Sequence, residues 1–92
     1  MPWIPIRSVD KHVHSMLIKM DDNHMLTIKS FKKDRTVTVK KSGGEFNIIE
    51  EGFRNQNFTV DEKSLKKTMK DIIDLEYPRS HKVMVSEQEI HT

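Results

Sequence analysis

Basic side chains gather in one short stretch of the sequence, together with threonines and an aromatic ring. Between residues 29 and 41 only Asp34 opposes the lysines and arginines, which are Lys29, Lys32, Lys33, Arg35, Lys40 and Lys41. Phe31 lies among them, and Thr27, Thr36 and Thr38 occupy alternate positions nearby. Sheet-based binders of single-stranded nucleic acid combine cations for phosphates, hydroxyl donors and an aromatic ring for stacking. The stretch therefore predicts a nucleic-acid-binding surface, although lysine and threonine are also ordinary residues on the solvent-facing side of a sheet.

A second group of polar side chains lies in the segment Tyr77–Lys82, with the sequence YPRSHK. Pro78 cannot continue a helix, so this segment is expected to form a corner before the next strand. Arg79 and Lys82 add two cations to the candidate nucleic-acid-binding residues, and a corner with exposed donors could bind an anion such as phosphate. The alternative is a structural corner, in which Arg79 contacts nearby acidic residues and Ser80 hydrogen-bonds to the backbone.

The histidines and serines do not form a pattern typical of catalysis or of metal binding. His12 and His14 would point the same way in a strand, but a zinc site needs three or four ligands. Ser80 and His81 are sequence neighbours, which does not by itself place a base within reach of a nucleophile. The chain has no cysteine, nucleophile elbow, phosphate-binding loop or dinucleotide fingerprint. We therefore predict a protein that is not an enzyme, with no catalytic residues, no metal and no cofactor.

Length and composition predict one small domain in a reducing compartment. The 92 residues carry a formal net charge of only +2, so any electrostatic argument must rest on where the charges lie. Cysteine is absent, whereas small extracellular domains are often held together by disulfides. No apolar stretch approaches the roughly 20 residues of a membrane span, and the start of the chain lacks the apolar core of a signal peptide. The expectation is a cytoplasmic protein with no membrane partner.

Period-two alternation of apolar residues predicts an antiparallel meander of four strands. The pattern occurs in the segments HVHSMLIKM, HMLTIKSF and KKDRTVTVKK and again after Gly43–Gly44. Asp21–Asn23 predicts a three-residue turn with Asn23 left-handed, and Gly43–Gly44 predicts a two-residue hairpin. The register set by these turns places a common apolar face on all four strands. Its expected pairs are Ile18 with Leu26, Met16 with Ile28, Leu26 with Val39, Ile28 with Val37, and Val39 with Ile48.

One helix and a short strand are expected after the meander. Residues 50–57 predict a connection, and the helix begins at a cap formed by Thr59 or Asp61 and ends near Leu75. Leu65, Met69 and Ile72 make its apolar stripe, while Val83 and Val85 alternate in a final strand. We expect an extended arm at 1–11, a domain at 12–86 and a frayed tail at 87–92.

The predicted fold class is α+β, a four-stranded antiparallel meander with one helix packed on one face and a short fifth C-terminal strand. Its order of elements, a meander followed by a helix, resembles that of Whirly-like binders of single strands. The first functional hypothesis is therefore binding of single-stranded DNA or RNA through a basic sheet face. The alternative is a homo-oligomeric or protein-interaction module, such as a homodimer, that uses the N-terminal arm, with its PWIPI segment, or a sheet edge.

Overall fold

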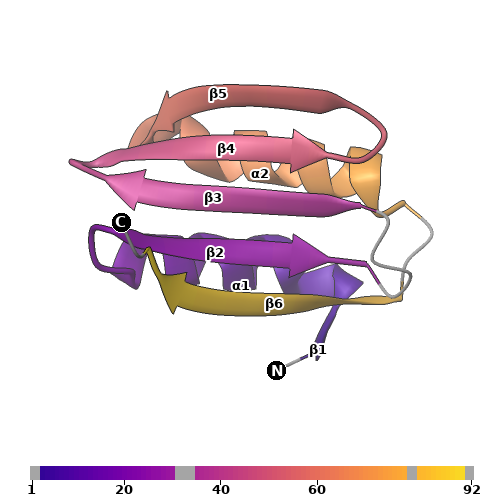
Figure 1. The fold of residues 1–92 in the computed structure, drawn as a ribbon. Helices are drawn as coiled ribbons and strands as arrows, with labels where there is room; N and C mark the ends of the chain where they lie inside the picture. Colours follow the sequence, from indigo (N-terminus) through magenta and orange to yellow (C-terminus); the bar gives the residue numbers. More distant parts are fainter. Residues whose placement is uncertain (1–2, 31–34, 79–80, 91–92) are drawn as a thin grey trace.

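The chain folds into two layers, a six-stranded antiparallel sheet and two helices that lie on one of its faces (Figure 1). The computed structural model describes residues 3–30, 35–78 and 81–90. Its elements are β1 (Trp3–Pro5), α1 (Ile6–Lys19), β2 (His24–Lys29), β3 (Thr36–Ser42), β4 (Glu45–Glu51), β5 (Asn55–Asp61), α2 (Glu62–Glu76) and β6 (Lys82–Glu89). The strand order in the sheet is β1-β6-β2-β3-β4-β5. No helix among the described residues is long and apolar enough to cross a membrane.

The predicted register is confirmed for β2, β3 and β4. Leu26 lies opposite Val39, which in turn lies opposite Ile48. Gly43 and Gly44 have φ angles of 58° and 81°, as the predicted two-residue hairpin requires. The apolar side chains of these strands are buried against the helices. The α+β class and the antiparallel sheet are thus as predicted, but the strand and helix counts differ from the prediction.

The first predicted strand is wrong, because these residues form α1. The segment contains two apolar patterns, one with period two and one with a spacing of four residues. The structure follows the second, since Val9, Val13 and Leu17 are fully buried on one side of the helix. The predicted pairing of Met16 and Ile18 with β2 therefore does not occur. The predicted left-handed Asn23 is confirmed at φ 67°, but its turn connects a helix to β2.

The extended conformation predicted for residues 1–11 is also wrong from Ile6 onward, where α1 begins. Pro5 is the N-cap of α1, and proline is tolerated at a helix start because the first N–H groups have no partner within the helix. The three residues before the helix form β1, in which Ile4 is buried opposite Val83 of β6. The apolar residues of the segment therefore dock on the sheet.

The connection predicted for residues 50–57 is a hairpin, because β4 extends to Glu51 and Asn55–Asp61 form β5. Asparagine and glutamine made this segment look like a turn, but β5 pairs with β4 over its whole length. Helix α2 is confirmed, and its N-cap is Asp61, the second of the two predicted candidates. The Oδ1 atom of Asp61 accepts a hydrogen bond of 2.9 Å from the Ser64 N–H, and this bond lowers the pKa of Asp61.

The predicted final strand is confirmed as β6, which continues to Glu89. Residues 87–89, predicted as part of a frayed tail, pair with β2, where Glu87 lies opposite Leu26. The strand lies between β1 and β2. The first and last strands of the chain are therefore neighbours in the sheet. Val83 and Val85 are both fully buried.

Candidate nucleic-acid interface

The sheet face opposite the helices is the candidate interface, and we call it the open face. No element among the described residues covers this face (Figure 1). Its side chains alternate along each strand with the buried ones. The pairing register places them in three rows across the strands. The rows are Trp3, Met84, Lys29, Thr36, Glu51 and Asn55; then Ser86, Thr27, Thr38, Ile49 and Asn57; then Gln88, Met25, Lys40, Asn47 and Thr59.

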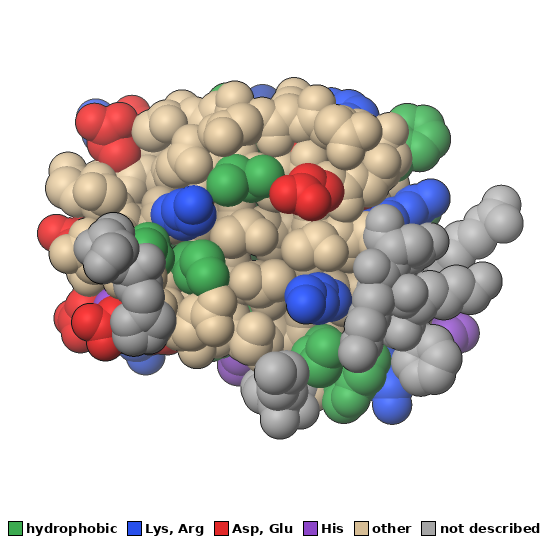
Figure 2. Space-filling view, viewed as in Figure 1, with side chains coloured by type: hydrophobic (Ala, Val, Ile, Leu, Met, Phe, Trp, Pro, Cys, Tyr) green, Lys and Arg blue, Asp and Glu red, His purple; other side chains and the backbone are tan. Residues whose placement is uncertain are grey.

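Uncharged side chains dominate the open face, and lysines are scattered among them (Figure 2). Lys29 and Lys40, both predicted for this face, project from β2 and β3. Lys82 is exposed at the start of β6, and its Nζ lies 5.3 Å from the centroid of the Trp3 ring. The structure therefore brings three of the predicted cations to the half of the face formed by β1, β6, β2 and β3.

Lys41 and Arg35, two further predicted cations, point to the helix side of the sheet. The Nζ atom of Lys41 donates to three carbonyl oxygens at the end of α1, those of Leu17 (3.2 Å), Ile18 (3.1 Å) and Met20 (2.7 Å). Arg35 donates a 2.6 Å hydrogen bond to the Glu76 carbonyl at the end of α2. Both cations satisfy helix C-termini, where positive charge is favourable.

Four predicted site residues lie outside the described part of the chain. They are Phe31, Lys32, Lys33 and Arg79. The aromatic ring expected on this face is therefore not placed.

Tyr77, which begins the predicted corner, is buried, and its hydroxyl lies 3.0 Å from the Ile28 carbonyl and 3.1 Å from that of Arg35.

Trp3 is the aromatic residue that sequence reasoning missed as a site candidate. It lies opposite Met84 and keeps 38% of its surface exposed, while its neighbour Ile4 is buried. The alternation of Trp3, Ile4 and Pro5 in an extended segment was a signal that the tryptophan faces away from the core. The stacking of Lys82 on the ring adds a cation–π interaction.

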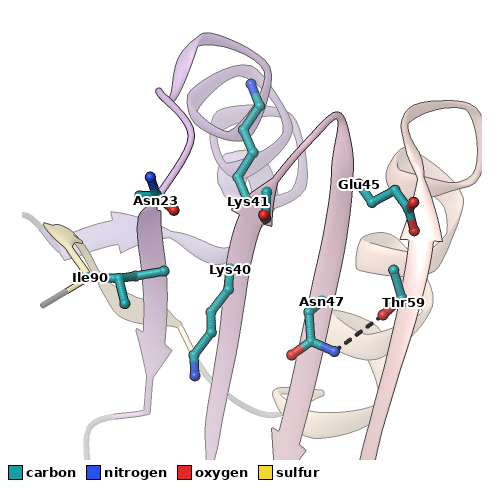
Figure 3. A pocket seen from close by; sticks show the side chains of 8 residues that line it. Asn23, Lys40, Lys41, Glu45, Asn47, Thr59 and Ile90 are labelled. Atoms are coloured by element: carbon teal, nitrogen blue, oxygen red, sulfur yellow. Dashed lines mark hydrogen bonds between the residues drawn. The ribbon is translucent and has the colours of Figure 1, made fainter. Parts of the chain in front are cut away.

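A shallow hollow of about 410 Å³ lies at the other end of the open face, near the β3–β4 hairpin. Figure 3 shows Lys40 and Lys41 pointing in different directions from β3, while Asn47 reaches toward Thr59. The Asn47 amide donates to the Thr59 hydroxyl at 3.3 Å and to the Asn57 side-chain oxygen at 2.7 Å. Glu45 also lines the hollow, so its lining is polar and of mixed charge.

Two glutamates form the most unusual buried cluster of the described residues. Glu50 and Glu76 expose 0% and 1% of their surface, and their side chains hydrogen-bond to each other. Glu76 also accepts the backbone N–H groups of Phe53 (2.8 Å) and Arg54 (3.2 Å) in the β4–β5 hairpin. The guanidinium of Arg54 and the amide of Gln56 donate to Glu50.

The environment of this pair moves the two pKa values apart. Burial, and then the hydrogen bond with Glu76, raises the pKa of Glu50, and these effects outweigh its bonds from Gln56 and Arg54. Burial alone would raise the pKa of Glu76 as well. Its hydrogen bonds from Glu50, Phe53 and Arg54, together with the charge of Arg35, nevertheless lower that pKa. As the pH falls, Glu50 therefore takes up a proton before Glu76 does.

Changing Gly52 to alanine is expected to destabilise the fold by about 2 kcal/mol, as overpacking of a closed site does. A Cβ atom at this position would collide with the Glu76 carboxylate and lie 3.0 Å from Cγ of Arg35. Urea unfolding would measure the loss. Gly44→Ala serves as the comparison. A Cβ atom at Gly44 meets no atom within 4 Å, so the cost of this change comes from backbone strain at φ 81° and not from a collision. A Gly52→Ala protein as stable as the wild type would show that the hairpin tolerates displacement of the carboxylate.

The described residues contain no group of three or more histidine, aspartate or glutamate side chains that could hold a metal ion. The cluster of Glu50 and Glu76 is closed by its own hydrogen bonds, and it holds the hairpin in place. No family model matches the chain, and no curated protein or solved structure is significantly similar to it.

Proposed function

We propose that the protein binds single-stranded nucleic acid on the half of the open face formed by β1, β6, β2 and β3. The observation that most supports this function is the uncovered sheet face with Trp3 and three lysines among neutral side chains. Binders of single strands combine a stacking ring with cations that follow the backbone. Trp3 supplies the ring, and Lys29, Lys40 and Lys82 supply the cations.

The distribution of charge favours this half of the face over the other. Glu45, Glu51 and Asp61 lie on the open side of β4 and β5, at the two ends of these strands. Carboxylates repel phosphates, so a bound strand would lie away from them. The hydroxyl groups of Thr27, Thr38 and Ser86 form a row between the lysines and can donate hydrogen bonds to phosphate or sugar oxygens.

Trp3 is the only tryptophan of the chain, so its fluorescence reports on the proposed interface directly. We expect single-stranded DNA or RNA to quench this fluorescence at low salt, and we expect the affinity to fall steeply as salt is added. Double-stranded forms should bind more weakly, because their bases are not available for stacking. Changing Trp3 to alanine should weaken binding about tenfold, which corresponds to the loss of one stacked base.

Charge reversal tests the lysines. The variant Lys29→Glu with Lys40→Glu should bind at least about tenfold more weakly, and its salt slope should fall by about 1.4 or more, since each phosphate contact contributes about 0.7. The matched control is Lys66→Glu with Lys70→Glu, which makes the same charge change on exposed positions of α2. Equal loss in both variants would indicate binding through net charge alone. Absence of binding at low salt would rule out the proposed function.

A further inference from the structure

The two edges of the sheet differ in how they are protected. Strand β1 has three residues and ends at Pro5, which cannot donate a backbone hydrogen bond. Strand β5 has seven residues, Asn55–Asp61, without a proline, a lysine or an arginine. It pairs with β4 through seven consecutive residues, so no bulge interrupts it. Proteins usually protect long edges by one of these features or by covering them, and no described element covers β5.

The side chains of β5 are also suited to a neighbouring strand. Phe58 and Val60 point to the helix side, where they pack against the core but remain only partly buried. Asn57 and Thr59 point to the open face and are exposed. Asp61, at the end of the strand, is the only charged residue of β5. An added strand would cover the apolar pair and meet almost no charge.

We propose that β5 pairs antiparallel with β5 of a second copy, so that two chains form a symmetric homodimer with one continuous sheet. The helices of both copies then lie on the same side, and residues of the apolar face must oppose one another. If the two strands also overlap over their whole length, the pairing is centred on Phe58, the middle residue of β5. Phe58 then opposes the partner's Phe58, and Asn57 opposes the partner's Thr59. Asp61 opposes the partner's Asn55, so no like charges meet.

A second copy fits this edge because the strand is complementary to itself in this register, as a two-fold interface requires. The arrangement also closes at two copies. The outer edges of the joined sheet are the two β1 strands, which are short and end in proline, so a third copy has no equivalent edge to extend. This proposal does not depend on nucleic-acid binding.

Measuring the mass by light scattering or sedimentation tests the proposal without any nucleic acid. At physiological salt, where charges on α2 are screened beyond about 8 Å, the wild type should have twice the chain's 10.9 kDa. Changing Asn57 and Thr59 to lysine sets like charges opposite each other across the interface and should give the monomer mass. The control is Ser86→Lys with Gln88→Lys, which has the same spacing and face on β6 and should remain dimeric. A monomeric wild type, or a lysine variant that stays dimeric, would overturn the proposal.

Cysteine cross-linking tests the register, in a chain that has no cysteine of its own. Directly opposite residues have Cα atoms about 4.5–5.5 Å apart, which suits a disulfide. A mixture of Asn57→Cys and Thr59→Cys chains should therefore form a disulfide-linked dimer on mild oxidation. Either variant alone should not, because identical positions lie roughly 8 Å apart. A mixture that fails to cross-link would contradict the β5 interface. This test does not require the lysine variant to fold.

Discussion

Replacing Glu76 by alanine is expected to lower the free energy of unfolding by at least about 3 kcal/mol, as breaking a buried charged network does. The change removes the acceptor of the Phe53 and Arg54 N–H groups and the hydrogen-bond partner of the Glu50 side chain. The two N–H groups would lose their acceptor in a partly buried hairpin, and the fully buried Glu50 would lose its hydrogen-bond partner. A domain of this size has a total stability on the order of 5–15 kcal/mol, so this single change removes much of it.

Urea unfolding with circular dichroism would measure the loss. The control is Asp74→Ala, an exposed acidic residue two positions earlier on α2, which should change stability by no more than about 0.5 kcal/mol. If both variants unfold at the same urea concentration, the carboxylate of Glu76 is not what holds the hairpin.

The same pair predicts a stability that passes through a maximum with pH. The pKa of Glu50 is raised, so its contribution is present at low pH and is lost as the pH rises through its folded value. The pKa of Glu76 is lowered, so its contribution is present above its ordinary value and is lost as the pH falls through its folded value. Stability should therefore be greatest between the two folded pKa values, where the pair holds one proton.

Changing Glu50 to glutamine should remove the loss at high pH and leave the loss at low pH. The amide offers an N–H to Glu76 without titrating, and its oxygen can still accept from Arg54 or Gln56. Unfolding curves across the pH range should therefore separate, with Glu50→Gln the more stable protein above the raised pKa. Identical high-pH decline in both proteins would show that another group titrates there.

Replacing Lys41 by methionine is expected to cost about 2 kcal/mol or more, the second large effect. The ammonium group donates to three carbonyl oxygens at the C-terminus of α1. Methionine fills a similar volume but leaves these oxygens without their donor and removes the charge that complements the helix dipole. The midpoint of thermal or urea unfolding measures this effect.

Lys40 supplies the matched control, because it is the next residue along β3 and points to the opposite face (Figure 3). Lys40→Met should leave stability within about 0.5 kcal/mol and weaken nucleic-acid binding. Lys41→Met should do the reverse, at a temperature where it remains folded. A Lys41→Met protein that is fully stable but fails to bind would assign this lysine to the interface instead.

Local chemistry explains why part of the fold could be predicted from the sequence. Gly43–Gly44 sets the β3–β4 register through its own backbone angles, and Asp61 caps α2 through a bond to a residue three positions away. In α1, by contrast, two apolar patterns overlap, and only packing against the sheet selects the helical one. For β5 the polar residues resemble a turn, and pairing with β4 decides the outcome.

The alternation of side chains along the predicted strands was sufficient to tell which candidate residues face the helices and which face away from them. Lys41 and Glu50 stand two residues from the buried Val39 and Ile48 of their strands, so their side chains face the helices. Arg35, which directly precedes β3, stands two residues from the buried Val37 and faces the same side. Alternation therefore already separated Lys41 from Lys40. The partners of these residues could not be predicted, because Glu76 and the end of α1 reach them only through the tertiary fold. Trp3 became a candidate for the interface only when the structure showed that β1 pairs with β6 at the edge of the sheet.

The position of β6 between β1 and β2 has a consequence for the order of folding. The meander β2–β5 and α2 can form from neighbouring segments as they leave the ribosome. The first strand cannot join the sheet until Lys82–Glu89 has been synthesised, because β6 is the strand that pairs with it among the described residues. Ribosome-bound chains should thus leave Trp3–Pro5 exposed to chaperones and proteases, and closure of the sheet becomes a late, non-local step.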